Sequence, residues 1–141
     1  MKFRFDKPTC QNIRKSLRKE WIETNGLGDY ASSSLICCNT RKYHGLLVAD
    51  LESSAGRHVL LSSLEESLLV GGRELCFSCR KHPGVFYPRG NEHLEEMDAG
   101  EWPVFRYRFG EVTLTRELML IPGHRLLLVR YEVRGTAPDT P

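Results

Sequence analysis

The chain has 141 residues, of which 40% are hydrophobic and 27% are charged, and its formal net charge is +2 at pH 7. A chain of this length falls in the usual range for one domain and can bury a core of its own. No stretch approaches the roughly 20 apolar residues of a membrane-spanning helix, and the start lacks the apolar segment of a secretory signal, so composition excludes a membrane protein and favours a cytoplasmic one.

The first 20 residues form a basic segment, in which seven Lys or Arg residues stand against two acidic ones. Ile13, Leu17 and Trp21 recur every four residues, which predicts a short helix with one apolar stripe. A basic helix can bind nucleic acid, but this run carries no base-reading chemistry. We therefore expect a solvated helix docked on the domain by its stripe, and no nucleic-acid partner.

The rest of the chain is patterned as β-strands. Runs of β-forming residues bounded by turn signals predict strands at 58–70, 73–81, 103–109, 112–121 and 124–133. In 112–121 every second residue is apolar except Arg116, which is typical of a strand with one covered face. Residues 80–103 are rich in proline and glycine and predict an irregular excursion over the surface. The predicted fold class is all-β and mainly antiparallel.

The last strand is apolar on both faces, with Leu127, Val129, Tyr131 and Val133 on one face and Leu126 and Leu128 on the other. A strand with two apolar faces is normally packed against other elements on both sides, so we predict that the chain self-associates as a homodimer. The polar residues that follow read as a tail or a truncation point. The expected organisation is a basic segment (1–20), a partial β-sandwich (21–134) and this tail (135–141).

Five cysteines are present, an odd number that does not suggest a disulfide framework. Cys76, Cys79 and His82 have part of the spacing of a zinc site. A single strand over 73–81 would place the two thiols on opposite faces, and no second C-x-x-C occurs. We expect no bound metal.

Three sequence patterns could indicate a catalytic site. Gly26–Ala31 has the G-x-G-x-x-A spacing of a dinucleotide loop, but no amphipathic helix follows it, which favours a turn between strands. Cys37 or Cys38 with His44 could form a nucleophilic pair, but the apolar neighbours favour strand thiols packed as small hydrophobes. Several carboxylates could act on a glycoside, but spacing alone does not place them in a pocket, and we expect solvated acids (Glu65, Glu66, Glu95, Glu96 and Asp98). We predict no catalytic residue and no cofactor in this chain.

Residues 20–51, followed by "GRHVLLSSLEESL" and later by "EWPVFRYRF", closely resemble the N-terminal domain of bacterial and archaeal glycogen debranching enzymes. The two-part hallmark reads E-W-x-x-x-N-G-x-G-x-Y-A-S and then N-T-R-x-Y-H-G-L-L. Asp29 stands where the family commonly has another glycine. The hallmark is matched by Glu20, Trp21, Asn25, Gly26, Gly28, Tyr30, Ala31 and Ser32, and then by Asn39, Thr40, Arg41, Tyr43, His44, Gly45, Leu46 and Leu47.

The resemblance implies a β-sandwich similar to the N-terminal domains of glucoamylase-type enzymes, placed ahead of an α/α-toroid catalytic domain. In the family that toroid carries the glycosidase carboxylates and hydrolyses α-1,6 branch linkages of glycogen. The expectation is therefore a non-catalytic piece, or a truncated relative, of such an enzyme, with glycogen or a related α-glucan and the toroid as its partners.

Six residues are candidates for contacting glucan: Arg41, Tyr43, His44, Asn39, Asn25 and Tyr30. If residues 40–48 are extended, Arg41 and Tyr43 project to one side and could provide the donor and the aromatic platform of a sugar site. The alternative is that Arg41 and Tyr43 form a structural anchor that braces the Asn25–Gly26 turn. A different function also stays open, in which the chain is a small interaction module that pairs through an exposed sheet edge and has no carbohydrate role.

Overall fold

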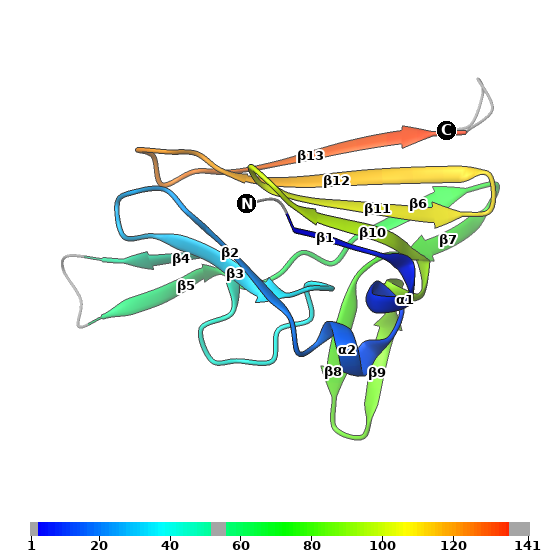
Figure 1. The fold of residues 1–141 in the computed structure, drawn as a ribbon, viewed down its shortest axis with the longest axis horizontal. Helices are drawn as coiled ribbons and strands as arrows, with labels where there is room; N and C mark the ends of the chain where they lie inside the picture. The colour runs from blue at the N-terminus through cyan, green and yellow to red at the C-terminus, as the bar shows by residue number, and fades with distance from the viewer. Residues whose placement is uncertain (1–2, 52–55, 136–141) are drawn as a thin grey trace.

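The computed structural model describes residues 3–51 and 56–135, and within them it consists mainly of antiparallel β-sheet in two facing layers (Figure 1). Sheet A contains, in spatial order, β1 (Phe3–Phe5), β10 (Leu94–Ala99), β11 (Pro103–Phe109), β12 (Val112–Leu120) and β13 (Leu127–Arg134). Sheet B contains β2 (Glu20–Thr24), β3 (Tyr30–Ser34), β4 (Gly45–Asp50) and β5 (Arg57–Leu61). The expectation of an all-β, sandwich-like fold is confirmed.

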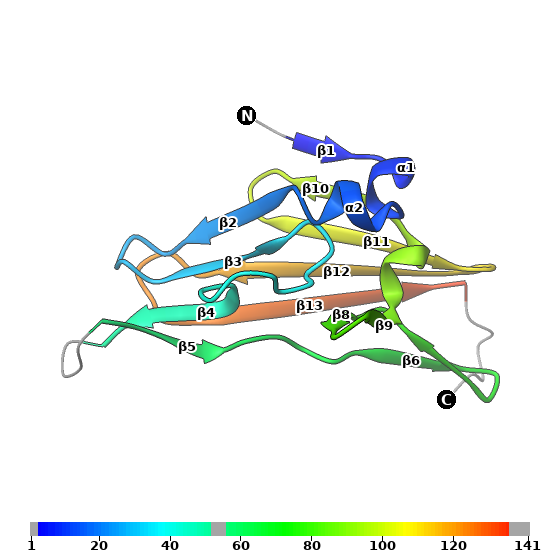
Figure 2. The same ribbon diagram turned by 90° about the horizontal axis from the view of Figure 1, so that it is seen from below.

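Two hairpins lie outside the two sheets: one reaches the end opposite the β2–β3 turn, and the other points away from sheet A (Figures 1 and 2). They are formed by β6 (Ser67–Val70) with β7 (Arg73–Cys76), and by β8 (Cys79–His82) with β9 (Val85–Arg89). Gly71 and Gly72 join β6 to β7 and both have positive φ, +55° and +74°, which only glycine adopts without strain in consecutive positions. The two glycines lie between the strands predicted at 58–70 and 73–81 and form the turn of this hairpin.

The core lies between the two sheets. Alternate residues of β12 are buried, as the sequence predicted, and Phe105 of β11 is fully buried. Trp21 of β2 meets Phe105 edge-on across the layers, with ring centroids 6.1 Å apart. Each such apolar side chain contributes about 1.5–3 kcal/mol by its burial, so the two sheets are held together mainly by this layer.

The N-terminal segment departs from the predicted single helix. It forms β1 and two one-turn helices, α1 (Lys7–Cys10) and α2 (Ile13–Ser16), whose first turns are capped by the side chains of Asp6 and Asn12. β1 pairs with β10, so the segment expected to lie ahead of the sandwich supplies an edge strand of sheet A. Trp21 lies in β2 and not on the helix, because the chain leaves helical geometry after Leu17.

Three other strand predictions need correction. Residues 58–70 form parts of two strands, β5 and β6, in different sheets, and residues 73–81 form parts of β7 and β8. The predicted surface excursion at 80–103 contains β8, β9, the 3-10 helix η1 (Gly90–His93) and β10. The local signal failed at β10 because a bulge between Leu94 and Glu96 breaks its alternation.

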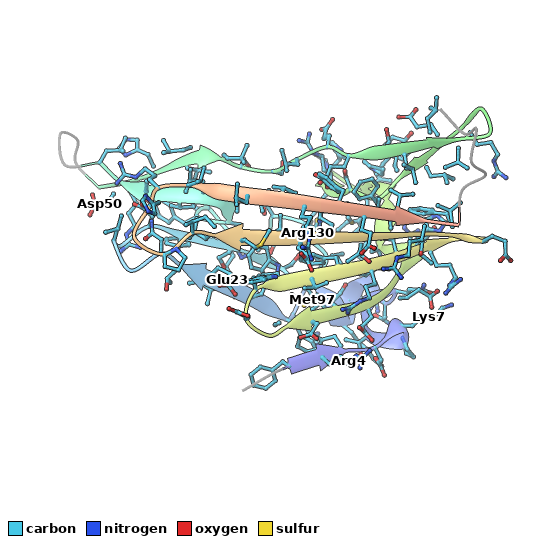
Figure 3. All side chains as sticks on the ribbon, turned by 90° about the horizontal axis from the view of Figure 1, so that it is seen from above. Arg4, Lys7, Glu23, Asp50, Met97 and Arg130 are labelled. Atoms are coloured by element: carbon cyan, nitrogen blue, oxygen red, sulfur yellow. The ribbon has the colours of Figure 1, made fainter. Side chains whose placement is uncertain are left out.

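β13 is an edge of sheet A, with no strand beyond it among the described residues. Figure 3 views sheet A from its outer side, where Arg4 and Arg130 lie toward opposite edges and form ion pairs with Glu96 and Glu117. Leu128 and Tyr131 of β13 are 45% exposed each. The predicted tail falls outside the described residues except for Gly135. No helix in the described part of the chain is long and apolar enough to cross a membrane.

Candidate functional site

The segment between β3 and β4 is held in place by side-chain bonds to its own backbone and neighbours. The Ser34 hydroxyl accepts the N–H of Cys38 at 3.0 Å and donates to the carbonyl of Cys38 at 2.7 Å. The Asn39 amide donates to the carbonyl of Ser62 at 2.9 Å and accepts from the hydroxyl of Ser33 at 2.7 Å. Asn39 is therefore a structural bridge, since both the nitrogen and the oxygen of its side-chain amide form hydrogen bonds within the protein.

The residues that follow form a tight turn. The N–H of His44 donates to the carbonyl of Arg41 at 3.2 Å, and the N–H of Thr40 donates to Nδ1 of His44 at 3.1 Å. Because Nδ1 accepts that bond, the ring proton is on Nε2, which lies 3.2 Å from the carboxylate of Glu20. His44 is only 5% exposed. Its ring closes the turn and is not available to a ligand.

This turn corrects the expectation of an extended segment over residues 40–48, because β4 begins only at Gly45. The alternation that placed Arg41 with Tyr43 on one side does not apply. The hydroxyl of Tyr30 donates to the carbonyl of Tyr43 at 3.0 Å and ties the turn to β3. Val48 in β4 is the register partner of Tyr30. It is fully buried, but it does not belong to the cluster of side chains that fills the space between the two sheets. The turn therefore lies over the outer face of sheet B, on the side away from sheet A (Figure 1).

The side chains that point outward from the turn are Arg41, Lys42 and Tyr43. Arg41 is 71% exposed and forms an ion pair with Glu20, whose pKa is held below its usual range mainly by the hydrogen bond from Arg41. Tyr43 is exposed, and Nζ of Lys42 lies 5.3 Å from the centre of its ring. The turn thus presents an aromatic ring and two cationic donor groups on a braced backbone, a combination that can contact sugar hydroxyls or a protein surface.

Asn25 belongs to a separate polar cluster at the β2–β3 turn. Its amide donates to Asp29 at 2.9 Å and to the carbonyl of His124 at 3.0 Å. Asp29 is 1% exposed and accepts two bonds from Arg125, which hold its pKa below the usual range. The cluster locks the β2–β3 turn of sheet B to the β12–β13 turn of sheet A. The turn predicted over Gly26–Ala31 does lie between two strands, but it ends earlier than predicted, because β3 begins at Tyr30. Asn25 has a structural role in this turn.

The six predicted residues therefore do not form one site. Glu20 and Lys42, which complete the exposed group, were not among the candidates, although a glutamate in the same hallmark was a signal for a partner of Arg41. Asp29 and Arg125 were also missed. Their pairing joins residues 96 positions apart, which no local pattern in a single sequence reveals.

The cysteines that the sequence singled out lie in a turn or at the ends of strands. Cys37 and Cys38 lie in the turn after β3 and not in a strand, and burial raises the pKa of Cys37 to about 11, which leaves it protonated at neutral pH. Cys76 ends β7 and Cys79 begins β8, so the single strand expected there is wrong. Among the described residues, no three His, Cys, Asp or Glu side chains come together to hold a metal ion.

Comparison with known families places this geometry in context. The family described as "Glycogen debranching enzyme N terminal" matches residues 19–140. This chain belongs to that glycogen debranching enzyme N-terminal family. No curated protein and no solved structure matches the chain.

Most of the residues that build the turn belong to the family hallmark. The hallmark of the debranching enzyme N-terminal family contains the residues that close the exposed turn, namely Glu20, Tyr30, Asn39, Thr40 and His44, and the one that locks the β2–β3 turn, Asn25. The hallmark also contains Arg41 and Tyr43, whose side chains are exposed and contribute little to holding the turn in place. These two are the hallmark residues best placed to contact something outside this chain.

Proposed function

We propose that this chain is the non-catalytic N-terminal domain of a glycogen debranching enzyme, and that its Arg41–Tyr43 turn contacts the α-glucan, the catalytic domain, or both. The catalytic domain is an α/α-toroid that hydrolyses α-1,6 branch linkages in glycogen catabolism in the cytoplasm. The observation that carries the proposal is a contrast within one turn. The side chains of His44 and Asn39 form hydrogen bonds that hold the turn in place, whereas those of Arg41 and Tyr43 face solvent.

Such a turn suits recognition because its backbone is fixed before any partner arrives. A ligand or domain that binds a braced turn loses little affinity to ordering the backbone. The tyrosine ring can stack on the apolar face of a sugar, and the guanidinium can donate to hydroxyls or to a carboxylate of a neighbouring domain. The ion pair with Glu20 keeps Arg41 oriented without burying it.

The test is activity in a full-length debranching enzyme that contains this domain. Arg41→Ala and Tyr43→Ala are each expected to lower kcat/KM on a branched glucan by roughly ten- to a hundredfold, since a lost hydrogen bond to a charged group costs about 1.5–3 kcal/mol. Arg108→Ala, an exposed arginine on the outer face of sheet A, serves as the control and is expected to leave kcat/KM unchanged. Unchanged activity in both turn variants would refute the proposal. The 141-residue chain alone is expected to hydrolyse neither glycogen nor pullulan.

A second candidate function is self-association through β13. Its outer edge is unpaired among the described residues, and Leu126 and Leu128 are 47% and 45% exposed. In an antiparallel two-fold pair centred on Tyr131, Arg130 would lie opposite Glu132 of the second copy, and Val129 opposite Val133. This complementarity favours a second copy of the chain as the partner of the edge.

A further inference from the structure

A polar cleft opens between the two hairpins, far along the chain from the Arg41–Tyr43 turn. Its volume is about 470 Å³, within the range of small-molecule sites. Ser67, Glu74 and Cys76 line one wall. They share one face of the β6–β7 hairpin, because Ser67 is the register partner of Cys76 and Glu74 lies two residues before it. The opposite face of this hairpin, with Leu68 and Leu75, packs against the core.

The second wall is built in the same way from the β8–β9 hairpin. Arg80, His82 and Tyr87 line the cleft, while Phe86 on the other face packs against the core. Nε2 of His82 lies 3.0 Å from the carbonyl oxygen of Tyr87 and joins the two strands. Tyr87 is 70% exposed, so its ring is open to a ligand at the rim.

The floor of the cleft is rigid. The Ser78 hydroxyl accepts the backbone N–H of Glu66 at 2.7 Å and fixes the segment just before β6, which carries Glu66. The Glu66 side chain is 8% exposed and is held by Arg116 and by the hydroxyl of Tyr131. This corrects the expectation that Glu66 is a solvated acid. Glu66 also lines a second hollow of about 430 Å³, beside Tyr131 and Val133, so the two hollows meet at this carboxylate.

The charges of the lining select the class of ligand. Three carboxylates face the cleft, and two of them are neutralised by arginines: Glu65 pairs with Arg80, and Glu66 with Arg116. Glu74 accepts a hydrogen bond from the Ser67 hydroxyl at 2.7 Å and forms no ion pair within the described part of the chain. An anionic ligand would therefore meet a surplus of negative charge, whereas a neutral ligand with many hydroxyl donors would satisfy the carboxylates and hydroxyls.

We infer that the cleft between the β6–β7 and β8–β9 hairpins binds a short, uncharged oligosaccharide, with the ring of Tyr87 stacked on a sugar face and the Glu74 carboxylate accepting from its hydroxyls. The choice of an α-glucan as that oligosaccharide rests on the proposed function. The site is distinct from the Arg41–Tyr43 turn, since the two lie on different elements and share no lining residue. It gives the domain a way to hold a glucan chain away from the turn.

The experiment is an NMR titration of the 141-residue chain with maltopentaose, an α-1,4 glucan, and with β-linked cellopentaose. Maltopentaose is expected to shift the amide signals of the two hairpins. Tyr87→Ala is expected to weaken binding about tenfold, while Tyr87→Phe, which keeps the ring, retains it. Val85→Ala, an exposed apolar residue of the same hairpin outside the lining, is the matched control and is expected to bind as the wild type does.

The outcomes separate this site from the proposed function. Absence of maltopentaose binding, or binding that Tyr87→Ala leaves unchanged, would overturn the cleft as a site. Equal binding of cellopentaose would overturn the α-glucan assignment. Tyr43→Ala is expected to remove any maltopentaose-dependent shift at the turn and to leave the amide shifts of the two hairpins in place. Loss of the hairpin shifts in Tyr43→Ala would place the ligand at the turn and overturn the cleft.

Discussion

Arg116 of β12 forms an ion pair with Glu66 inside the molecule, where the two side chains are 4% and 8% exposed. The guanidinium also donates to the hydroxyl of Tyr107 at 3.2 Å and lies 4.5 Å from the centre of the Phe105 ring. The single break in the apolar face of β12 is therefore a buried cation paired with a carboxylate, and it links sheet A to the segment that leads into the β6–β7 hairpin.

The first prediction concerns this pair. Arg116→Met leaves Glu66 buried without its counter-ion, and we expect the free energy of unfolding to fall by about 3–5 kcal/mol in urea denaturation. Arg106→Met, which removes an arginine paired with Glu96 on the exposed face, is the control and is expected to cost less than about 1 kcal/mol. Equal losses in the two variants would show that Arg116 is not a buried anchor.

The second prediction is a pH dependence caused by Glu23, a half-buried residue of β2. Burial raises the pKa of its carboxyl to about 7 in the folded chain, above the ordinary value of about 4.3 in the unfolded chain. Between these two values the folded state binds more protons than the unfolded state, so this group lowers stability as the pH rises from about 4.5 to 7. Above about pH 7 the loss is complete.

Glu23→Gln removes this titration. The variant is expected to be more stable than the wild type by about 1–3 kcal/mol at pH 8 and equally stable near pH 4, where both side chains are neutral. Thermal unfolding at the two pH values measures the difference. Glu101→Gln, at an exposed position, is the control. A variant that gains nothing at pH 8 would mean that the carboxyl of Glu23 is not desolvated.

The strands that the sequence predicted well are those whose pattern is local. In β11 the apolar residues alternate without interruption, and in β12 only Arg116 breaks the alternation. A glycine turn joins the two strands, so face and pairing follow from neighbours in the chain. β1 and β10 could not be predicted in this way. β1 has only three residues and pairs with β10, which lies far from it along the chain, and β10 contains a bulge in its pairing with β11.

The conformation of the exposed turn likewise could not be predicted from the local sequence pattern. Residues 40–48 are not extended throughout, because the side chain of His44 accepts the N–H of Thr40 and closes a turn ahead of β4. Composition alone does not distinguish a histidine that binds its own backbone from one that faces a ligand. Arg41 and Tyr43, two of the candidate residues, lie on the surface in this turn.

The third prediction concerns the unpaired edge of sheet A. The chain is expected to sediment as a dimer at micromolar concentration, because β13 exposes apolar side chains and an unpaired backbone edge. Leu128→Arg places a charge in that surface and is expected to give a monomer. Leu27→Arg makes the same change at an exposed leucine of the β2–β3 turn and is expected to remain dimeric. A wild-type monomer would contradict pairing through β13.

The last prediction separates the bracing residues of the turn from the exposed ones. His44→Ala removes a buried ring, leaves the N–H of Thr40 without its acceptor and opens space over sheet B, so the free energy of unfolding is expected to fall by about 2–4 kcal/mol. Arg41→Ala removes only an exposed ion pair with Glu20 and is expected to cost less than about 1 kcal/mol. In thermal unfolding, His44→Ala should therefore lower Tm by several degrees and Arg41→Ala by little. If Arg41→Ala lowered Tm as much as His44→Ala, Arg41 would be part of the brace, and its loss of activity would report only the fraction of folded protein. A normal Tm together with reduced kcat/KM per folded molecule is the result expected of a residue that contacts the glucan or the catalytic domain.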